Sequence, residues 1–139
     1  MKLIEWFEHR AAQGPDAVAL VRGQDRLTYR ELQERANRCA HLLRAAGVTA
    51  EVVVGVCGPA DLNTSTLLLA ILKAGGTYLP LDPTHPDERL RHMLHKAGTH
   101  LVVTHNDTQA QRLATLHPNV TTWQQLTTDL HHQPTTAPP

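Results

Sequence analysis

The spacing of hydrophobic residues changes several times along the chain, and each change marks a new element. Apolar residues recur at helical spacing over residues 2–12, which predicts a short amphipathic helix. Two short extended runs follow, at 17–21 and 26–29, with the turn residues 23–25 between them. This arrangement predicts a two-stranded ribbon with a tight turn.

A longer amphipathic stretch begins at Tyr29. Its apolar stripe recurs every three or four residues as far as Gly47, which is the expected end of the helix. Thr28 stands where an N-cap belongs, and Glu31 follows three residues later. The pair predicts a capping box at the start of this second helix.

The middle of the chain alternates apolar runs with helical patterns. Val52–Cys57 is continuous and rich in β-branched residues, which is typical of a strand buried on both faces of a parallel sheet. The pattern then predicts a helix capped by Asp61 and ended by Gly75-Gly76, a strand over 77–81, a helix with Pro86 in its first turn, a strand over 100–104, a helix over 108–116, a short strand at Val120 and a helical turn over 123–126. This order indicates an α/β protein with a partial doubly wound, mostly parallel sheet flanked by helices.

Composition narrows the possible functions. The 139 residues are enough for one domain with a modest core, and 13 acidic residues balance 13 basic ones. The basic residues are dispersed and aromatic residues make up only 4% of the chain, so we expect no nucleic-acid partner. Acidic residues interrupt the apolar positions near the amino terminus, and no apolar run approaches a membrane span. We therefore expect a cytoplasmic protein without membrane attachment.

Ten histidines raise the question of a metal site. His92 and His95 lie three residues apart on a predicted helix, without an acidic or cysteine partner nearby in the sequence. His131 and His132 fall in a segment rich in proline and threonine that offers no rigid geometry. A dedicated site needs three or four convergent ligands, so we predict no metal site.

Candidate nucleophiles are equally few. Cys39 and Cys57 have neither metal-ligand spacing nor the density of a disulfide scaffold, and we expect both to be buried thiols. Ser65, the single serine, lacks the glycine neighbours of a hydrolase nucleophile. The paired acids Glu31/Glu34 and Asp87/Glu88 fall at helix starts, where the helix dipole favours acids regardless of catalysis. We assign no catalytic residue.

No nucleotide-binding fingerprint occurs in the sequence. Neither G-x-x-x-x-G-K-[ST] nor G-x-G-x-x-G is present. Residues 55–59 follow a predicted strand and precede a helix, but Pro59 removes an N–H donor where a phosphate cradle would need one. We therefore assign no cofactor-binding residue.

Two motifs nevertheless resemble a known family. Leu72–Pro83, with the sequence LKAGGTYLPLDP, and Leu27–Leu32, with the sequence LTYREL, resemble core motifs of the adenylation domains of nonribosomal peptide synthetases. The resemblance implies that residues 1–130 are the N-terminal subdomain of an adenylate-forming enzyme fold, truncated relative to a complete domain. Residues 131–139 are expected to be a Pro/Thr-rich linker or tail.

The resemblance also implies an activity. Such domains use ATP and Mg²⁺ to activate an amino acid as an aminoacyl-adenylate with release of pyrophosphate, and then pass it to a phosphopantetheine carrier protein. The two motifs present are scaffold signatures in that family. Its phosphate loop, amino-acid pocket and catalytic lysine come later in the chain, so we expect these residues to be inactive alone and to need the remainder of the domain, in cis or in trans.

Three other interpretations remain open. The chain could be a fragment of an acyl- or aryl-acid ligase of the same superfamily, a non-catalytic remnant or docking piece, or an unrelated flavodoxin-like binding module. Two positions depart from the peptide-synthetase pattern. Residues 57–66 are more polar than is usual there, and His85 stands where an aromatic residue is usual.

Overall fold

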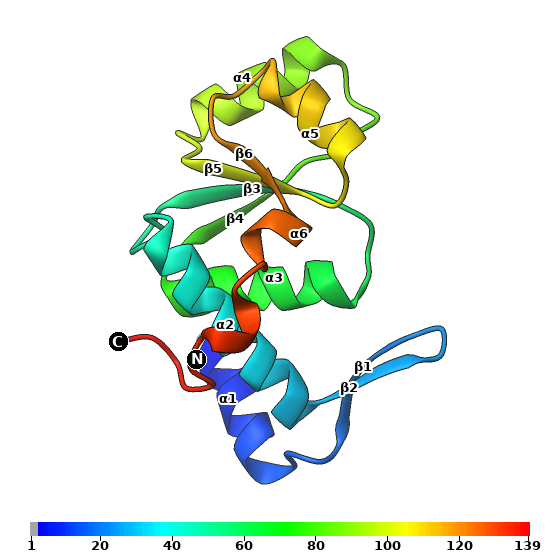
Figure 1. Ribbon diagram of the computed structural model, residues 1–139, viewed down its shortest axis with the longest axis vertical. Helices are drawn as coiled ribbons and strands as arrows, with labels where there is room; N and C mark the ends of the chain where they lie inside the picture. The colour runs from blue at the N-terminus through cyan, green and yellow to red at the C-terminus, as the bar shows by residue number, and fades with distance from the viewer. Residues whose placement is uncertain (1–2) are drawn as a thin grey trace.

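The computed structural model describes residues 3–139 and shows a sheet between two layers of helices (Figure 1). Lys2, expected to open the first helix, lies outside the described residues. The elements in chain order are α1 (Leu3–Gln13), β1 (Val18–Arg22), β2 (Asp25–Thr28), α2 (Tyr29–Ala45), β3 (Val53–Cys57), α3 (Leu62–Ala74), β4 (Thr77–Pro80), α4 (Asp87–Lys96), β5 (Leu101–Thr104), α5 (Asp107–Ala114), β6 (Val120–Thr122), α6 (Trp123–Leu126) and the 3₁₀ helix η1 (Leu130–His132).

The main sheet is parallel, with the strand order β4-β3-β5-β6. From β3 the chain first moves outward to β4 and then returns to the other side of β3 as β5. Helix α3 covers one face together with α2, whereas α4 and α5 cover the other (Figure 1). This confirms the predicted α/β fold with a doubly wound parallel sheet. Pro80, which cannot donate to a ladder, lies in the edge strand β4.

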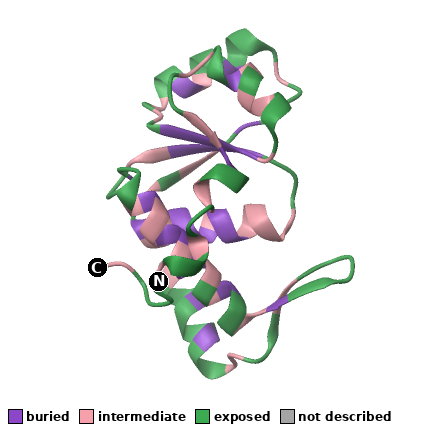
Figure 2. Ribbon diagram, in the orientation of Figure 1, coloured by how far each residue is buried: buried purple, intermediate pink, exposed green. Residues whose placement is uncertain are grey.

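Alternate residues of the strands face the two layers. Val54 and Val103 pack with Leu43 of α2 and Ile71 of α3. The opposite face holds Val102, Leu81, Leu90, Leu94 and Leu113. Because both faces are covered, the strands β3 and β5 are almost entirely buried (Figure 2).

A smaller cluster joins the amino-terminal elements to this core. Phe7 of α1, Leu27 of β2, Leu32 of α2 and Leu69 of α3 are buried together. β1 and β2 form the predicted antiparallel ribbon, and its outer end is exposed (Figure 2). The amino-terminal helix and the ribbon therefore dock onto the α2–α3 layer.

Local capping follows the sequence closely at two helices. The Thr28 hydroxyl accepts the Glu31 N–H at 3.1 Å, and Glu31 Oε1 accepts the Thr28 N–H at 2.9 Å, which confirms the capping box. Asp61 caps α3 through the Thr64 N–H at 2.8 Å. Gly75 ends α3 with a φ of 93°, the left-handed conformation expected at Gly75 or Gly76.

At most elements the predicted and observed boundaries differ by one or two residues. Gly47 terminates α2 as predicted, because it directly follows the C-cap Ala46 and has a φ of 93°. Pro86 is the N-cap of α4 and does not enter its first turn. α5 begins at Asp107 because the Asn106 side chain accepts the Gln109 N–H at 2.9 Å and fixes the start one residue early.

The last residues run back along α2. Asn37 Nδ2 donates to the Thr135 carbonyl at 2.8 Å, and His41 Nε2 lies 2.8 Å from the Thr136 carbonyl. Residues 133–139 have no regular secondary structure. Over residues 3–139, none of the helices has the length and apolar character needed to cross a membrane.

Candidate functional site

A small crevice lies at the carboxyl ends of β3 and β5. The chain passes from β3 to α3 on one face of the sheet and from β5 to α5 on the other face, and doubly wound sheets bind ligands where the connections diverge in this way. A cavity of about 140 Å³ opens there. Its polar lining comes from Asp61, Asn63, Thr64, Thr104, His105 and Gln124, and its apolar lining includes Trp123.

Gly58 allows the two loops at this edge to approach each other. A Cβ at this position would lie 3.1 Å from Thr64 Oγ1 and 3.5 Å from His105 Cβ. The side chain of Asp61 is already used to cap α3. The start of α3 and the loop after β5 are thus held together as the two walls of the crevice.

His105 is held in one tautomer by its neighbours. Its Nδ1 lies 3.3 Å from the Cys57 carbonyl, which can only accept, so Nδ1 carries the proton. Its Nε2 lies 2.9 Å from Asn106 Nδ2, which can only donate. Both ring nitrogens are therefore engaged, and His105 is a positioning residue that ties the β3 and β5 ends together.

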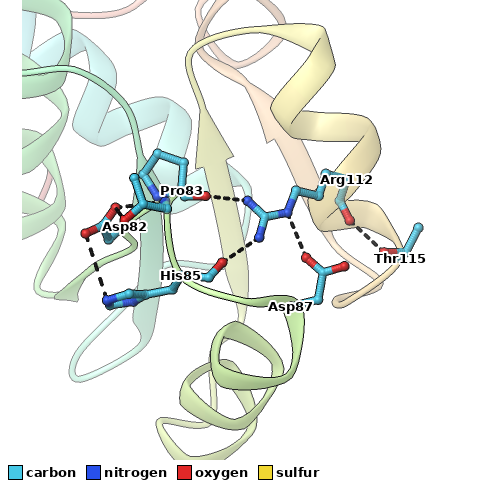
Figure 3. Close-up of polar contacts among 7 residues, drawn as sticks. Asp82, Pro83, His85, Asp87, Arg112 and Thr115 are labelled. Atoms are coloured by element: carbon cyan, nitrogen blue, oxygen red, sulfur yellow. Dashed lines mark hydrogen bonds and ion pairs between the residues drawn. The ribbon is translucent and has the colours of Figure 1, made fainter.

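A second polar cluster holds the loop after β4 (Figure 3). Arg112 of α5 donates from Nε to Asp87 Oδ1 at 2.8 Å, from Nη1 to the Pro83 carbonyl at 2.7 Å and from Nη2 to the His85 carbonyl at 2.6 Å. All three acceptors lie in or just after the end of the LKAGGTYLPLDP motif. One guanidinium therefore fixes the path of the chain from β4 into α4.

Asp82 stabilises the same loop from inside. Its Oδ1 accepts the Thr84 N–H at 2.9 Å and the Thr84 hydroxyl at 2.7 Å. These hydrogen bonds favour the carboxylate and lower the pKa of Asp82. His85 lies 3.9 Å from Asp82 Oδ2 and keeps its Nδ1 buried, without a partner among the described residues.

Lys73, in the same motif, ties three helices together. Its Nζ lies 3.3 Å from Glu8 Oε1 of α1 and 3.1 Å from Gln33 Oε1 of α2, and 5.8 Å from the centre of the Phe7 ring. The side chain is 1% exposed, and burial lowers its pKa. Lys73 therefore has a structural partner on each side and is not presented to the crevice.

The residues weighed as candidates in the sequence lie apart from one another. Cys39 and Cys57 are buried free thiols on opposite faces of the sheet, and burial raises the pKa of Cys39 to about 12. Ser65 lies in the first turn of α3, where its N–H donates to the Asp61 carbonyl. His92 and His95 are exposed on α4.

The remaining candidates either contact neighbouring side chains or are exposed on the surface. His131 meets Arg38, and His132 meets Asp129. Glu31 belongs to the capping box, and Asp87 belongs to the Arg112 cluster. Glu34 and Glu88 are exposed. Within residues 3–139, no three or more His, Cys, Asp or Glu side chains gather in a way that could hold a metal ion.

Sequence reasoning missed the residues that shape the crevice. His105, Trp123 and Gln124 lie just after predicted strands. Their position at strand ends was the one feature of the sequence that could have marked them as crevice residues. Among residues 3–139, the lining includes no lysine or arginine, and the one carboxylate that it includes, Asp61, caps a helix. The crevice residues therefore do not by themselves fit ATP with Mg²⁺, which needs positive charge and convergent oxygen ligands.

The strand order and the loop after β4, which Arg112 holds in place, define a scaffold of the doubly wound α/β class. Sequence comparison identifies its family. The AMP-binding enzyme family matches residues 7–137, so the chain belongs to this family. It is 51% identical over 92 residues to tyrocidine synthase 2 of Brevibacillus parabrevis, and 40% identical over 111 residues to bacitracin synthase 3 of Bacillus licheniformis. These matches cover 66% and 80% of the chain, but only 3% and 2% of the two relatives.

Solved structures agree with this assignment. The nonribosomal peptide synthetase FmoA3, bound to α-methyl-L-serine-AMP, superposes with a TM-score of 0.78 at 32% identity, covering 99% of this chain and 15% of that one. VinN superposes with a TM-score of 0.91 over the full length of this chain and 37% of its own, although only 20% of residues are identical. The fold is therefore that of the N-terminal part of an adenylation domain.

Proposed function

We propose that this chain is the N-terminal part of an adenylation domain that activates an amino acid for nonribosomal peptide synthesis. The observation that carries the proposal is the 51% identity to tyrocidine synthase 2 over 92 residues. Lys73 within the LKAGGTYLPLDP motif, and Arg112, which binds the end of it, hold this motif in place through hydrogen bonds. Both residues serve to hold helices and loops, which is the role of a scaffold.

The chain's own contribution is positional. Arg112 and Asp82 fix the loop after β4, and His105 joins the ends of β3 and β5. In the part of the chain that the structure describes, the crevice lining has no lysine or arginine that could bind phosphate. We therefore propose that ATP, Mg²⁺ and the amino acid are bound by the remainder of the domain, in cis or in trans, and that the described residues support that remainder without reacting themselves.

A carrier protein is the proposed second partner. One structural neighbour is an artificially fused adenylation–PCP di-domain of NpsA and ThdA, at 21% identity to this chain. It supports a phosphopantetheine carrier as the acceptor of the activated amino acid. We place this partnership in the cytoplasm.

An aryl-acid ligase is the second candidate within the family. NpsA, which is 22% identical to this chain, has been solved with 3-hydroxyanthranilyl-AMSN, which carries an aromatic acyl group. The higher identity to peptide synthetases favours the amino-acid assignment. A third candidate, a non-catalytic docking piece, predicts binding to the remainder without restored activity.

The direct test is amino-acid-dependent ATP–pyrophosphate exchange. We expect the 139-residue chain to give no exchange above a no-enzyme blank with any of the twenty amino acids, because phosphoryl-type chemistry depends on positioned cationic donors. Exchange by the chain alone would contradict the proposal that ATP, Mg²⁺ and the amino acid are bound by the remainder of the domain.

A further inference from the structure

The segment 133–139, here called the strap, lies along α2 and is held there by side chains of that helix (Figure 1). Asn37 Nδ2 donates to the Thr135 carbonyl at 2.8 Å, and His41 Nε2 lies 2.8 Å from the Thr136 carbonyl oxygen. A carbonyl can only accept, so Nε2 of His41 carries a proton and donates it. The two donors are four residues apart and therefore lie on adjacent turns of one helix face.

The composition of the strap suits this kind of contact. Residues 134, 138 and 139 are prolines, which have no backbone N–H. The strap therefore cannot complete a strand ladder, and its carbonyl groups are what a neighbouring element can bind. Both hydrogen bonds from α2 are accepted by backbone oxygen atoms. Helix α2 thus recognises the extended backbone of the strap and not particular side chains.

Asn37 is an unusual residue to find on the buried side of α2. It is 5% exposed, and the same helix buries Ala36 and Ala40 beside it. Its Oδ1 is buried without a hydrogen-bond partner among residues 3–139, so the side chain carries a desolvation cost that the bond to Thr135 offsets only in part. An apolar side chain of the same size would avoid this cost. The amide therefore serves the contact with the strap more than the stability of the helix.

The strap has a role to play if this chain is the N-terminal part of a domain. We propose that Asn37 and His41 anchor the strap and thereby set the direction in which the chain continues into the remainder of the domain. This inference rests on the proposed function. A displacement of reacting groups by about 1 Å can lower a rate by about a hundredfold, so a fixed connection between the two parts favours activity.

A nitroxide label on the strap reports the anchoring without any activity measurement. Ala137→Cys provides an exposed attachment point, and the native Cys39 and Cys57 are buried. We expect the label to be restrained in the 139-residue chain. Asn37→Leu and His41→Ala should each shorten its rotational correlation time about threefold or more, because a released segment moves like a free chain end.

Denaturant melts separate anchoring from folding. Asn37→Leu should leave the midpoint close to that of the parent, because leucine removes the unpartnered Oδ1 together with Nδ2. His41→Ala covers the case in which leucine disturbs the packing of α2. His92→Ala, an exposed residue of α4 on the other side of the sheet, is the control and should leave the label restrained. The proposal is wrong if the label on the parent is as mobile as in the denatured chain, or if neither α2 variant releases it.

The effect on the remainder is measured in a hybrid, in which residues 1–139 replace the matching segment of a tyrocidine synthase 2 adenylation domain. We expect Asn37→Leu and His41→Ala to lower kcat for ATP–pyrophosphate exchange about tenfold, with the thermal midpoint unchanged. Normal exchange by a hybrid whose strap is released would overturn the inference. A hybrid that is inactive before any substitution would contradict the proposed function, and the label measurement would then decide by itself whether α2 anchors the strap.

Discussion

At the residue scale, the two cationic side chains in and beside the signature motif, Lys73 and Arg112, have structural roles. Lys73 is surrounded by Glu8, Gln33 and Phe7. Arg112 donates hydrogen bonds to the segment that leads from β4 into α4. Such contacts stabilise a scaffold because a buried cation keeps its charge only with partners close by.

The thiols allow a direct check of this scale. Cys39 is inaccessible and has its pKa raised to about 12, and burial also raises the pKa of Cys57. We expect a thiol reagent at pH 8 to label neither cysteine in the folded chain and both after denaturation. Labelling of either cysteine at the rate of a free peptide thiol would show that the core opens in the native state.

The capping box gives a pH-dependent prediction. Hydrogen bonds from Thr28 lower the pKa of Glu31 in the folded chain. A group with a lowered folded pKa stabilises above its unfolded pKa of about 4.3, and that contribution is lost as the pH falls through the folded pKa. The stability difference between the parent and Glu31→Gln, from denaturant melts, should therefore be present at pH 7 and shrink below pH 4. A difference that grows on acidification would contradict the assignment.

Thr28 itself has a measurable effect at neutral pH. Thr28→Ala should lower the free energy of unfolding by about 1 kcal/mol, because an orphan N–H at the start of α2 loses its acceptor. Thr108→Ala, inside α5, is the control and should change stability far less. Equal melts for the parent and Thr28→Ala would mean that the cap contributes nothing.

At the element scale, the sequence predicted the order and type of the helices and strands, because their hydrophobic periods differ. The hydrophobic pattern could not predict the strand order, the crevice or the path of residues 133–139. They depend on contacts between residues far apart, such as His105 with Cys57 and Asn37 with Thr135. Local pattern carries no information about such pairs.

The two glycines after α3 are needed for different reasons. Gly75 has a φ of 93°, whereas a Cβ on Gly76 would lie 2.8 Å from Val48 Cγ1 and 2.9 Å from the Val52 carbonyl oxygen. Gly75→Val should destabilise by more than about 1 kcal/mol through backbone strain, and Gly76→Ala by about 1–3 kcal/mol through overpacking. Gly14→Ala, where a Cβ has room, should be nearly neutral. Thermal melts in which Gly14→Ala is as destabilising as Gly75→Val or Gly76→Ala would contradict this account.

At the scale of the whole molecule, the chain folds around a doubly wound parallel sheet, and Lys73 and Arg112 make structural contacts in and beside its family signature motif. It spans 3% of tyrocidine synthase 2 and 2% of bacitracin synthase 3, and the described residues that line its crevice include no lysine or arginine for binding phosphate. The central claim is that these residues support activity supplied by other residues of the same domain.

A hybrid domain tests that claim most directly. Residues 1–139 would replace the matching segment of a tyrocidine synthase 2 adenylation domain, and amino-acid-dependent ATP–pyrophosphate exchange would be measured for the hybrid, the parent domain and the 139-residue chain. We predict exchange by the hybrid with the parent's amino-acid preference, and none by the chain alone. A hybrid that melts cooperatively like its parent but gives no exchange, or a chain that exchanges unaided, would contradict the account.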